Sequence, residues 1–282
     1  MNDAILSRVV IENVRPSVDE GRFPAKGIVG DTVPVTEDIF ADGHDSISAR
    51  LLYRKSGEIE WRETAMAAAE NDEWRGGFSI GEPGMYTFAV EGWIDRFSSW
   101  RKALQKKLDA GQEIGADLLI GARIVETAAE RADGGGAARL RGLAETLKDA
   151  SDPAAAAAIA LGAQAAKLMA EFPDRTQSVR TQKEYPLQAD PPVARFSTWY
   201  ELFPRSCSPE PGKHGTFRDC EALLPEIAKM GFDVLYLPPI HPIGETNRKG
   251  KNNTTGAGPD DPGSPWAIGS EAGGHNRLLV QG

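Results

Sequence analysis

Polar side chains that could bind a ligand gather in one stretch of this 282-residue chain, between Gly244 and Gly274. The stretch is rich in glycine, proline and asparagine, and it follows a short apolar run at Val234–Leu237. Lys249 lies within it and offers three hydrogen-bond donors on a flexible stem. A bare lysine in a polar loop is more often a solvated surface residue. A loop of this length after a parallel strand is usually functional or disordered.

The other polar candidates have weaker claims. Asn252 and Asn253 could hydrogen-bond a ligand, but we expect them to shape the loop. His241 follows the apolar run, where ligand-facing residues collect, and a structural, hydrogen-bonded histidine is an equal alternative. Asp260 and Asp261 are neighbours in the loop, but nothing makes them a catalytic pair. Cysteines and histidines show no zinc-site spacing, so we expect neither a metal nor a cofactor.

Aromatic residues near the same stretch could stack on a ligand. We expect Trp199 and Tyr200 to pack in a core instead. Trp266 has a better case for stacking because it lies in the long loop. His214 and His275 have no stronger claim than His241.

A strand–helix–strand unit must position these residues. Phe196–Phe203 is a strand candidate, and the next helix is expected over Phe217–Met230, with Thr216 as its cap. The run Val234–Leu237 does not alternate, which is typical of a parallel strand buried on both faces. Asp233 stands at the amino-terminal end of that strand, away from the loop.

Residues 8 to about 95 are predicted to form β-structure. Apolar and polar residues alternate in several short segments separated by turn signals, as in half-buried strands. About seven strands at this spacing favour an immunoglobulin-like β-sandwich. The expected strands after the first, at Val9–Ile11, are Lys26–Val29, Thr32–Ile39, Ser46–Tyr53, Trp61–Met66, Trp74–Ile80 and Met85–Trp93.

Residues 97 to about 172 change to helical periodicity. Four amphipathic segments joined by short breaks favour a small bundle. The last is predicted as one helix, with Asp152 as its cap and an apolar face that runs from Leu161 to Phe172. Residues 176–190 are extended again, and we interpret them as a strand that returns to the sandwich, so that the bundle is an insertion.

Composition excludes several classes of protein. The net charge of −9 and the pI near 5.1 disfavour partners such as nucleic acid or an anionic membrane, which need basic surface. Apolar runs are too short to span a membrane, and the first residues do not resemble a secretory signal. Cys207 and Cys220 make no disulfide framework, and we expect reduced thiols in a cytoplasmic protein. The length is short for a sandwich followed by a complete (β/α)₈ barrel of about 250 residues.

The chain resembles the α-amylase superfamily (glycoside hydrolase family 13), through Trp199–Ser206 and Gly231–Gly244. Asn247–Asn253 and Gly263–Gly269 narrow the resemblance to the α-1,4-glucan:maltose-1-phosphate maltosyltransferases, which also carry a sandwich interrupted by a bundle before their barrel. The implied domains are a sandwich at 1–97 with its last strand at 176–190, an inserted bundle at 98–175, and the truncated first part of a (β/α)₈ (TIM) barrel at 191–282.

This resemblance implies a retaining transfer of maltosyl from α-maltose 1-phosphate to the non-reducing end of an α-1,4-glucan. Such chemistry needs two carboxyl groups about 5–5.5 Å apart. In the family these carboxyl groups follow later strands of the barrel, so we place no catalytic residue on this chain. Lys249, in the Arg-Lys-Gly motif, is implied to bind the maltosyl part of the donor.

The resemblance also implies a homodimer. Residues 277–282 depart from the family pattern, which suggests an N-terminal fragment, and we expect this fragment to be inactive alone because the resemblance places no catalytic carboxyl group on it. Two alternatives stay open: another superfamily enzyme (branching or trehalose-forming), or a non-catalytic carbohydrate-binding or dimerisation module.

Overall fold

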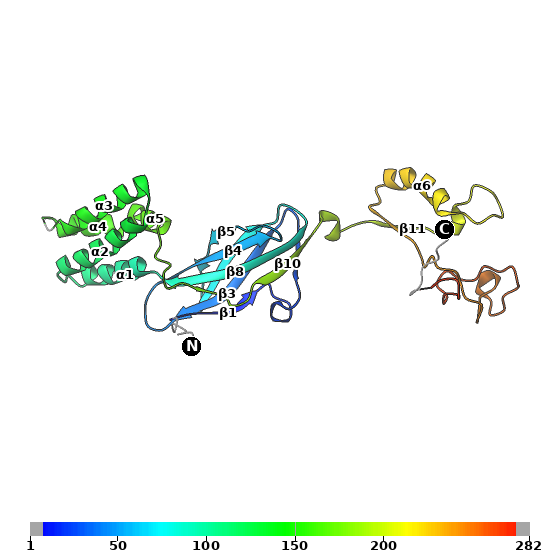
Figure 1. The fold of residues 1–282 in the computed structure, drawn as a ribbon, viewed down its shortest axis with the longest axis horizontal. Helices are drawn as coiled ribbons and strands as arrows, with labels where there is room; N and C mark the ends of the chain where they lie inside the picture. The colour runs from blue at the N-terminus through cyan, green and yellow to red at the C-terminus, as the bar shows by residue number, and fades with distance from the viewer. Residues whose placement is uncertain (1–7, 150, 275–282) are drawn as a thin grey trace. The chain divides into compact units, whose positions relative to one another are not determined.

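The structure, a computed structural model, describes residues 8–149 and 151–274 (Figure 1). The chain divides into two compact units, Met1–Pro192 and Val193–Gly282. The first unit holds strands β1–β10 and helices α1–α5, and the second holds β11, β12 and α6. The described residues form mixed sheets and six α-helices, with no closed barrel among them.

Two sheets make up the β part of the first unit. In sheet order, the first contains β1 (Val9–Arg15), β3 (Thr32–Ala41), β7 (Glu73–Ser79) and β6 (Ala67–Ala68). The second contains β2 (Ala25–Ile28), β10 (Tyr185–Asp190), β8 (Gly84–Ile94), β4 (Ile47–Lys55) and β5 (Arg62–Ala65), while β9 (Val179–Arg180) also pairs with β8. Only β10 and β2 pair in parallel in these two sheets as described. A short 3-10 turn, η1 (Asp19–Gly21), follows β1.

The inward faces of the two sheets share one apolar core. Phe78 of the first sheet belongs to the same buried cluster as Phe88 of the second, and their ring centroids lie 6.0 Å apart. Strand β3 alternates as its sequence predicts, since Val33, Val35, Glu37 and Ile39 are buried and the residues between them are more exposed. Full burial of one large apolar side chain contributes about 1.5–3 kcal/mol. Alternation therefore fixes which face of each strand points inward.

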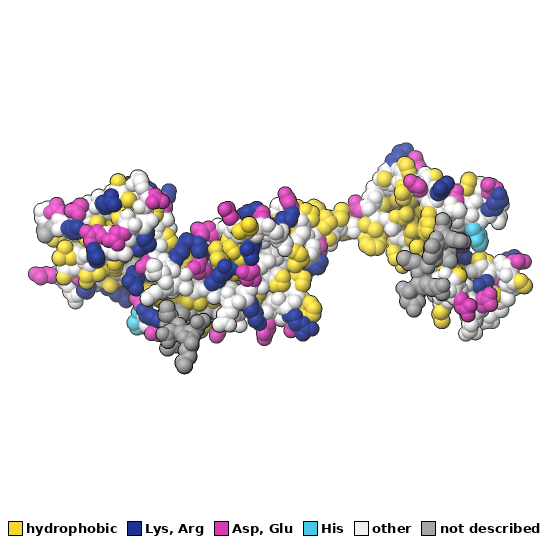
Figure 2. Space-filling view, in the orientation of Figure 1, with side chains coloured by type: hydrophobic (Ala, Val, Ile, Leu, Met, Phe, Trp, Pro, Cys, Tyr) yellow, Lys and Arg dark blue, Asp and Glu magenta, His cyan; other side chains and the backbone are white. Residues whose placement is uncertain are grey.

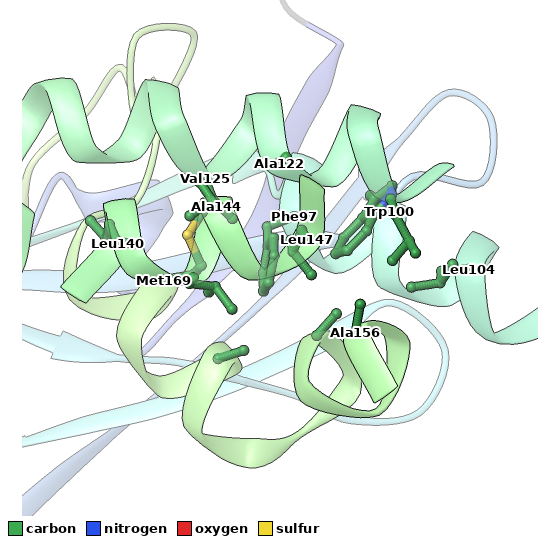
Figure 3. Close-up of a cluster of buried hydrophobic side chains, with 14 of the residues drawn as sticks. Phe97, Trp100, Leu104, Ala122, Val125, Leu140, Ala144, Leu147, Ala156 and Met169 are labelled. Atoms are coloured by element: carbon green, nitrogen blue, oxygen red, sulfur yellow. The ribbon is translucent and has the colours of Figure 1, made fainter. Parts of the chain in front are cut away.

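Five helices lie between β8 and β9 in the chain. They are α1 (Arg96–Asp109), α2 (Gly115–Arg131), α3 (Gly134–Lys148), α4 (Pro153–Leu161) and α5 (Ala163–Glu171). All five contribute side chains to a second apolar cluster, which Figure 3 shows around Phe97, Val125 and Leu147. The indole of Trp100 joins α1 to α2, because its Nε1 donates a hydrogen bond to the carbonyl of Asp117 at 2.7 Å.

The last helix of the bundle departs from the prediction. Asp152 caps α4 as expected, with its carboxylate accepting from the backbone N–H of Ala155 at 3.0 Å. One continuous helix was expected, but the chain bends by 58° between α4 and α5. The break falls at Gly162, whose extended backbone (φ −65°, ψ 156°) ends α4 and begins α5. The apolar periodicity continues across this break, which is why the sequence pattern did not reveal it.

The second unit contains one strand–helix–strand arrangement. Strand β11 (Trp199–Glu201) pairs in parallel with β12 (Val234–Tyr236), and α6 (Phe217–Lys229) connects them. The remaining short elements are the 3-10 turns η2 (Pro192–Ala194), η3 (Pro204–Cys207) and η4 (Lys251–Asn253). Thr216 caps α6 as predicted and forms a capping box with Asp219.

The burial predicted for β12 was wrong. Val234 and Leu235 are only half-buried and Tyr236 is 40% exposed. A parallel strand is buried on both faces only where other strands and helices cover it, and the described part of this unit supplies one partner strand and one helix.

By length and apolar content, no single helix in residues 8–149 and 151–274 could cross a membrane. Helices α4 and α5 meet that test only as a bent pair.

Candidate functional site

The candidate site is a cleft in the second unit, where β11 and β12 end and the long loop begins. Its volume is about 930 Å³. Because parallel strands end at the same edge, the segments that follow β11 and β12 meet there. The lining consists of Phe203, Pro204, Arg205, residues 214–218, residues 238–243, Arg248, Pro262 and Pro265.

The charge of the cleft lining contrasts with the acidic chain. Arg205, Arg218 and Arg248 line it, together with His214 and His241, and none of its described lining residues carries a carboxylate. The guanidinium groups of Arg205 and Arg218 make no hydrogen bond or ion pair with any other described residue. A cleft with cationic walls attracts anions. This arrangement suits a phosphate or another anionic group.

Arg248 holds the long loop in place. Its Nη2 donates to the carbonyl of Ile243 at 2.8 Å, and its Nε donates to the carbonyl of Gly244 at 3.0 Å. Its Nη1 lies 3.5 Å from the carbonyl of Asp261, on the far side of the loop. Sequence reasoning missed this role. The available signal was its place beside Lys249 in the Arg-Lys-Gly motif.

Lys249 lies next to this anchor and is half-buried. It is not one of the residues that line the cleft. Within the described residues its ammonium group has no hydrogen-bond or ion-pair partner. Its assignment to donor binding therefore stays a prediction.

The two asparagines shape the loop, as expected. Asn252 (φ 52°) and Asn253 (φ 61°) adopt the left-handed conformation that asparagine tolerates best among residues with side chains. Asp261 also shapes the loop, because its carboxylate accepts from the backbone N–H of Gly258 at 2.7 Å. Asp260 and Asp261 therefore show no arrangement typical of catalytic carboxylates.

Of the three candidate histidines, two line the cleft and one lies outside the described residues. His214 and His241 both line the cleft. The Nδ1 atom of His241 lies 3.2 Å from the carbonyl of Pro242, which fits the structural alternative. His275 lies outside the described residues. The described residues also hold no group of three or more histidine, cysteine, aspartate or glutamate side chains placed to bind a metal ion.

The aromatic residues differ from expectation at one position. Trp199 was predicted to pack in a core, but it is 59% exposed; its ring centroid lies 6.3 Å from that of Tyr236, and its Nε1 donates to the hydroxyl of Ser197 at 2.8 Å. The reason is again the two-stranded sheet, which leaves that face uncovered in the described residues. Tyr200 is half-buried against Phe232, with ring centroids 5.1 Å apart. Figure 2 shows apolar side chains gathered on the visible face of this unit.

Trp266 contacts one of the residues that line the cleft. It is 56% exposed, and its ring meets Phe203 edge-on with centroids 5.4 Å apart. Phe203 lines the cleft, so the indole lies beside the cleft wall. Its exposed surface remains available for stacking.

Asp233 has a structural role. Its carboxylate accepts from the backbone N–H of Thr198 at 2.8 Å and from its hydroxyl at 3.0 Å. Both hydrogen bonds lower the pKa of Asp233, and the one from the backbone N–H has the larger effect. They join the starts of β11 and β12, at the opposite end of the strands from the cleft, as the sequence predicts.

Known proteins resemble the chain over almost its whole length. Residues 7–191 match the family model for α-1,4-glucan:maltose-1-phosphate maltosyltransferase, domain N/S. The protein of that name from Chlorobaculum tepidum is 55% identical over 272 residues, which cover 96% of this chain and 40% of the relative. Those from Methylacidiphilum infernorum (43% over 274 residues) and Myxococcus xanthus (42% over 280 residues) cover 96% and 97% of this chain. The chain spans 40% of the first relative's length, 40% of the second's and 42% of the third's.

Proposed function

The chain belongs to the α-1,4-glucan:maltose-1-phosphate maltosyltransferase family, and we propose that it supplies the N-terminal part of such an enzyme. The proposed reaction transfers maltosyl from α-maltose 1-phosphate to the non-reducing end of an α-1,4-glucan. One observation carries the proposal beyond the family: the cleft at the ends of β11 and β12 is lined by arginines and by no described carboxylate. A sugar phosphate is an anion that such a lining would attract.

The roles that we propose for residues in the cleft (Arg205, Arg218 and Arg248) and beside it (Lys249 and Trp266) follow from side-chain chemistry. The guanidinium groups of Arg205 and Arg218 attract the donor phosphate, since neither is engaged by another described residue. Arg248 holds the loop through backbone carbonyls. Lys249 donates hydrogen bonds to hydroxyls of the maltosyl unit, and Trp266 offers an apolar face.

Retaining transfer requires a carboxylate nucleophile and a carboxyl acid/base about 5–5.5 Å apart. The described lining of the cleft contains neither. We therefore propose that residues 1–282 alone bind the donor but do not cleave it. The carboxyl groups would come from the part of the relatives' length that residues 1–282 do not span.

The proposed architecture has three parts. Residues 1–97, with a last strand at 176–190, form an immunoglobulin-like sandwich; 98–175 form an inserted bundle; and 191–282 begin a (β/α)₈ barrel. The pairing of β9 and β10 with β8 supports the insertion, and the parallel β11–α6–β12 unit supports the barrel. A cytoplasmic homodimer that needs no cofactor completes the proposal.

A chimera tests the activity. In it, residues 1–274 of this chain replace the matching segment of the Chlorobaculum tepidum relative. We expect the chimera to release phosphate from α-maltose 1-phosphate in the presence of glycogen, and this chain alone to release none. Release by the chain alone would refute the proposed division of the active site, and a folded but inactive chimera would refute the proposed function.

Two lysines of one loop provide a matched pair for the binding role. Lys249→Ala in the chimera should raise KM for the donor roughly 10- to 100-fold, the loss expected for hydrogen bonds from a charged donor. Lys251→Ala removes the same charge from an exposed position two residues away and should leave KM unchanged. Equal increases in KM for the two substitutions would mean that Lys249 acts only through the positive charge of the loop and does not contact the donor.

A further inference from the structure

The only two cysteines of the chain lie side by side in the second unit. Cys207 is the last residue of η3 and Cys220 lies in the first turn of α6. The Cys220 thiol donates to the sulfur of Cys207 at 3.4 Å, and the Cys207 thiol donates to the carbonyl of Phe203 at 3.3 Å. Both are free thiols with their sulfur atoms in contact.

The backbone around the pair fixes this proximity. The backbone N–H of Gly215 donates to the carbonyl of Arg205 at 3.0 Å. Gly215 also packs so closely on the backbone of Pro204 and Ser208 that a β-carbon there would overlap both. The capping box of Thr216 then sets the direction in which α6 begins. The two sulfur atoms are therefore held together by two turns of backbone as well as by side-chain rotamers.

The pair combines one reachable sulfur with one protected sulfur. Cys207 is half-buried, whereas Cys220 is only 4% exposed. A disulfide bond is about 2.05 Å long, so the sulfurs must approach by about 1.4 Å from their present 3.4 Å. A small oxidant can reach Cys207, and its partner is already in place.

We propose that Cys207 and Cys220 are a modification site at which a small peroxide converts the dithiol into an intrachain disulfide. The Cys207 thiolate attacks one peroxide oxygen, the O–O bond breaks, and the sulfur becomes a sulfenic acid while hydrogen peroxide loses its other oxygen as water. The Cys220 sulfur then attacks the sulfenic sulfur, the S–S bond forms, and a second water leaves. Two thiols and one hydrogen peroxide yield one disulfide and two waters.

The disulfide would close residues 207–220 into a covalent loop that carries one wall of the cleft. His214, Thr216 and Arg218 belong to this loop and line the cleft. Oxidation would therefore restrict the motion of the segment of the cleft wall that contains Arg218. The chemistry of the pair does not depend on the proposed function.

Mass spectrometry of the full chain tests the site. After treatment with hydrogen peroxide, unfolding and alkylation, we expect the chain to have lost two hydrogens and to take up no alkylating agent. Dithiothreitol should restore both thiols. Trypsin cleaves after Lys213, between the two cysteines, so the two peptides should stay joined until the disulfide is reduced. Two alkylated thiols, uptake of oxygen without a cross-link, or a disulfide between two chains would each overturn the proposal.

Two comparisons keep the test independent of any one variant. Cys207→Ser and Cys220→Ser each leave one thiol and should give no intrachain cross-link. In a glutathione redox buffer, the equilibrium constant for disulfide formation in the native chain should exceed that of the urea-unfolded chain roughly tenfold or more, because the fold holds the sulfurs together. An equal or smaller equilibrium constant in the native chain would show that the fold does not favour formation of the disulfide.

Discussion

Glu37 is the most consequential ionisable residue in the core of the first unit. It lies on the inward face of β3 and is 1% exposed. Neither carboxylate oxygen has a hydrogen-bond partner among the described residues. Burial, and then the neighbouring charge of Asp38, raise its pKa from 4.5 to about 8. We predict that Glu37→Gln stabilises the chain at neutral and alkaline pH.

The magnitude follows from proton linkage. Between pH 4.5 and about 8 the folded chain holds a proton on Glu37 that the unfolded chain has released, so stability falls as pH rises. At 1.36 kcal/mol per pKa unit, the raised pKa of Glu37 lowers the free energy of unfolding by about 3 kcal/mol at pH 7 and by about 5 kcal/mol above pH 8. Wild type should therefore lose about 4 kcal/mol between pH 5 and pH 9 through this group, and Glu37→Gln should not.

Urea unfolding at pH 5, 7 and 9 measures the effect, with amide exchange in β3 to locate it. Glu12→Gln is the matched control because Glu12 is an exposed carboxylate on the neighbouring strand β1. The stability of Glu37→Gln relative to wild type should grow with pH, while that of Glu12→Gln should stay constant. A Glu37→Gln difference that does not change with pH would refute the linkage argument.

Three further outcomes test the bundle and the thiol pair. Gly121→Ala would drive a methyl group into the indole of Trp100 and should lower the free energy of unfolding, measured by thermal unfolding, by about 1–3 kcal/mol. Gly115→Ala, on the same helix, meets open space and should leave this free energy unchanged or raise it by up to about 1 kcal/mol. Asp152→Ala removes the cap of α4 and should cost about 1 kcal/mol; an unchanged Tm would contradict the cap. Burial raises the pKa of the Cys207 thiol to about 11, so its oxidation rate by hydrogen peroxide should rise about tenfold per pH unit between pH 7 and 9, and a flat rate would contradict attack by the thiolate.

Local pattern predicted seven of the first unit's strands, but it missed the two-residue β6, and the single strand expected at 176–190 is two strands, β9 and β10. In β3 the inward positions follow from alternation alone, and β8 begins at Gly84 (φ 132°), directly before the strand expected at Met85–Trp93. Alternation did not reveal the chemistry at Glu37, because a period of two marks a position as inward without saying whether its side chain finds a partner.

Features that depend on distant parts of the chain could not be predicted from the sequence. The exposure of Trp199 depends on what covers β11, and the contact between Cys207 and Cys220 depends on how η3 turns toward α6. Spacing along the chain carries no information about either. The break at Gly162 is local, but the apolar periodicity on both sides hides it.

The Arg-Lys pair of the long loop combines the structural role of Arg248 with the binding role that we propose for Lys249. A guanidinium presents five donors in a rigid, planar fork, and Arg248 directs that fork at backbone carbonyls on both sides of the loop. An ammonium group is a compact donor on a flexible stem, which suits hydroxyls that differ in direction. Arg248 thus fixes the backbone from which Lys249 extends. Because Lys249 has no polar partner among the described residues, its donors remain free, and exchanging the two residue types would weaken both the anchoring of the loop and the proposed binding.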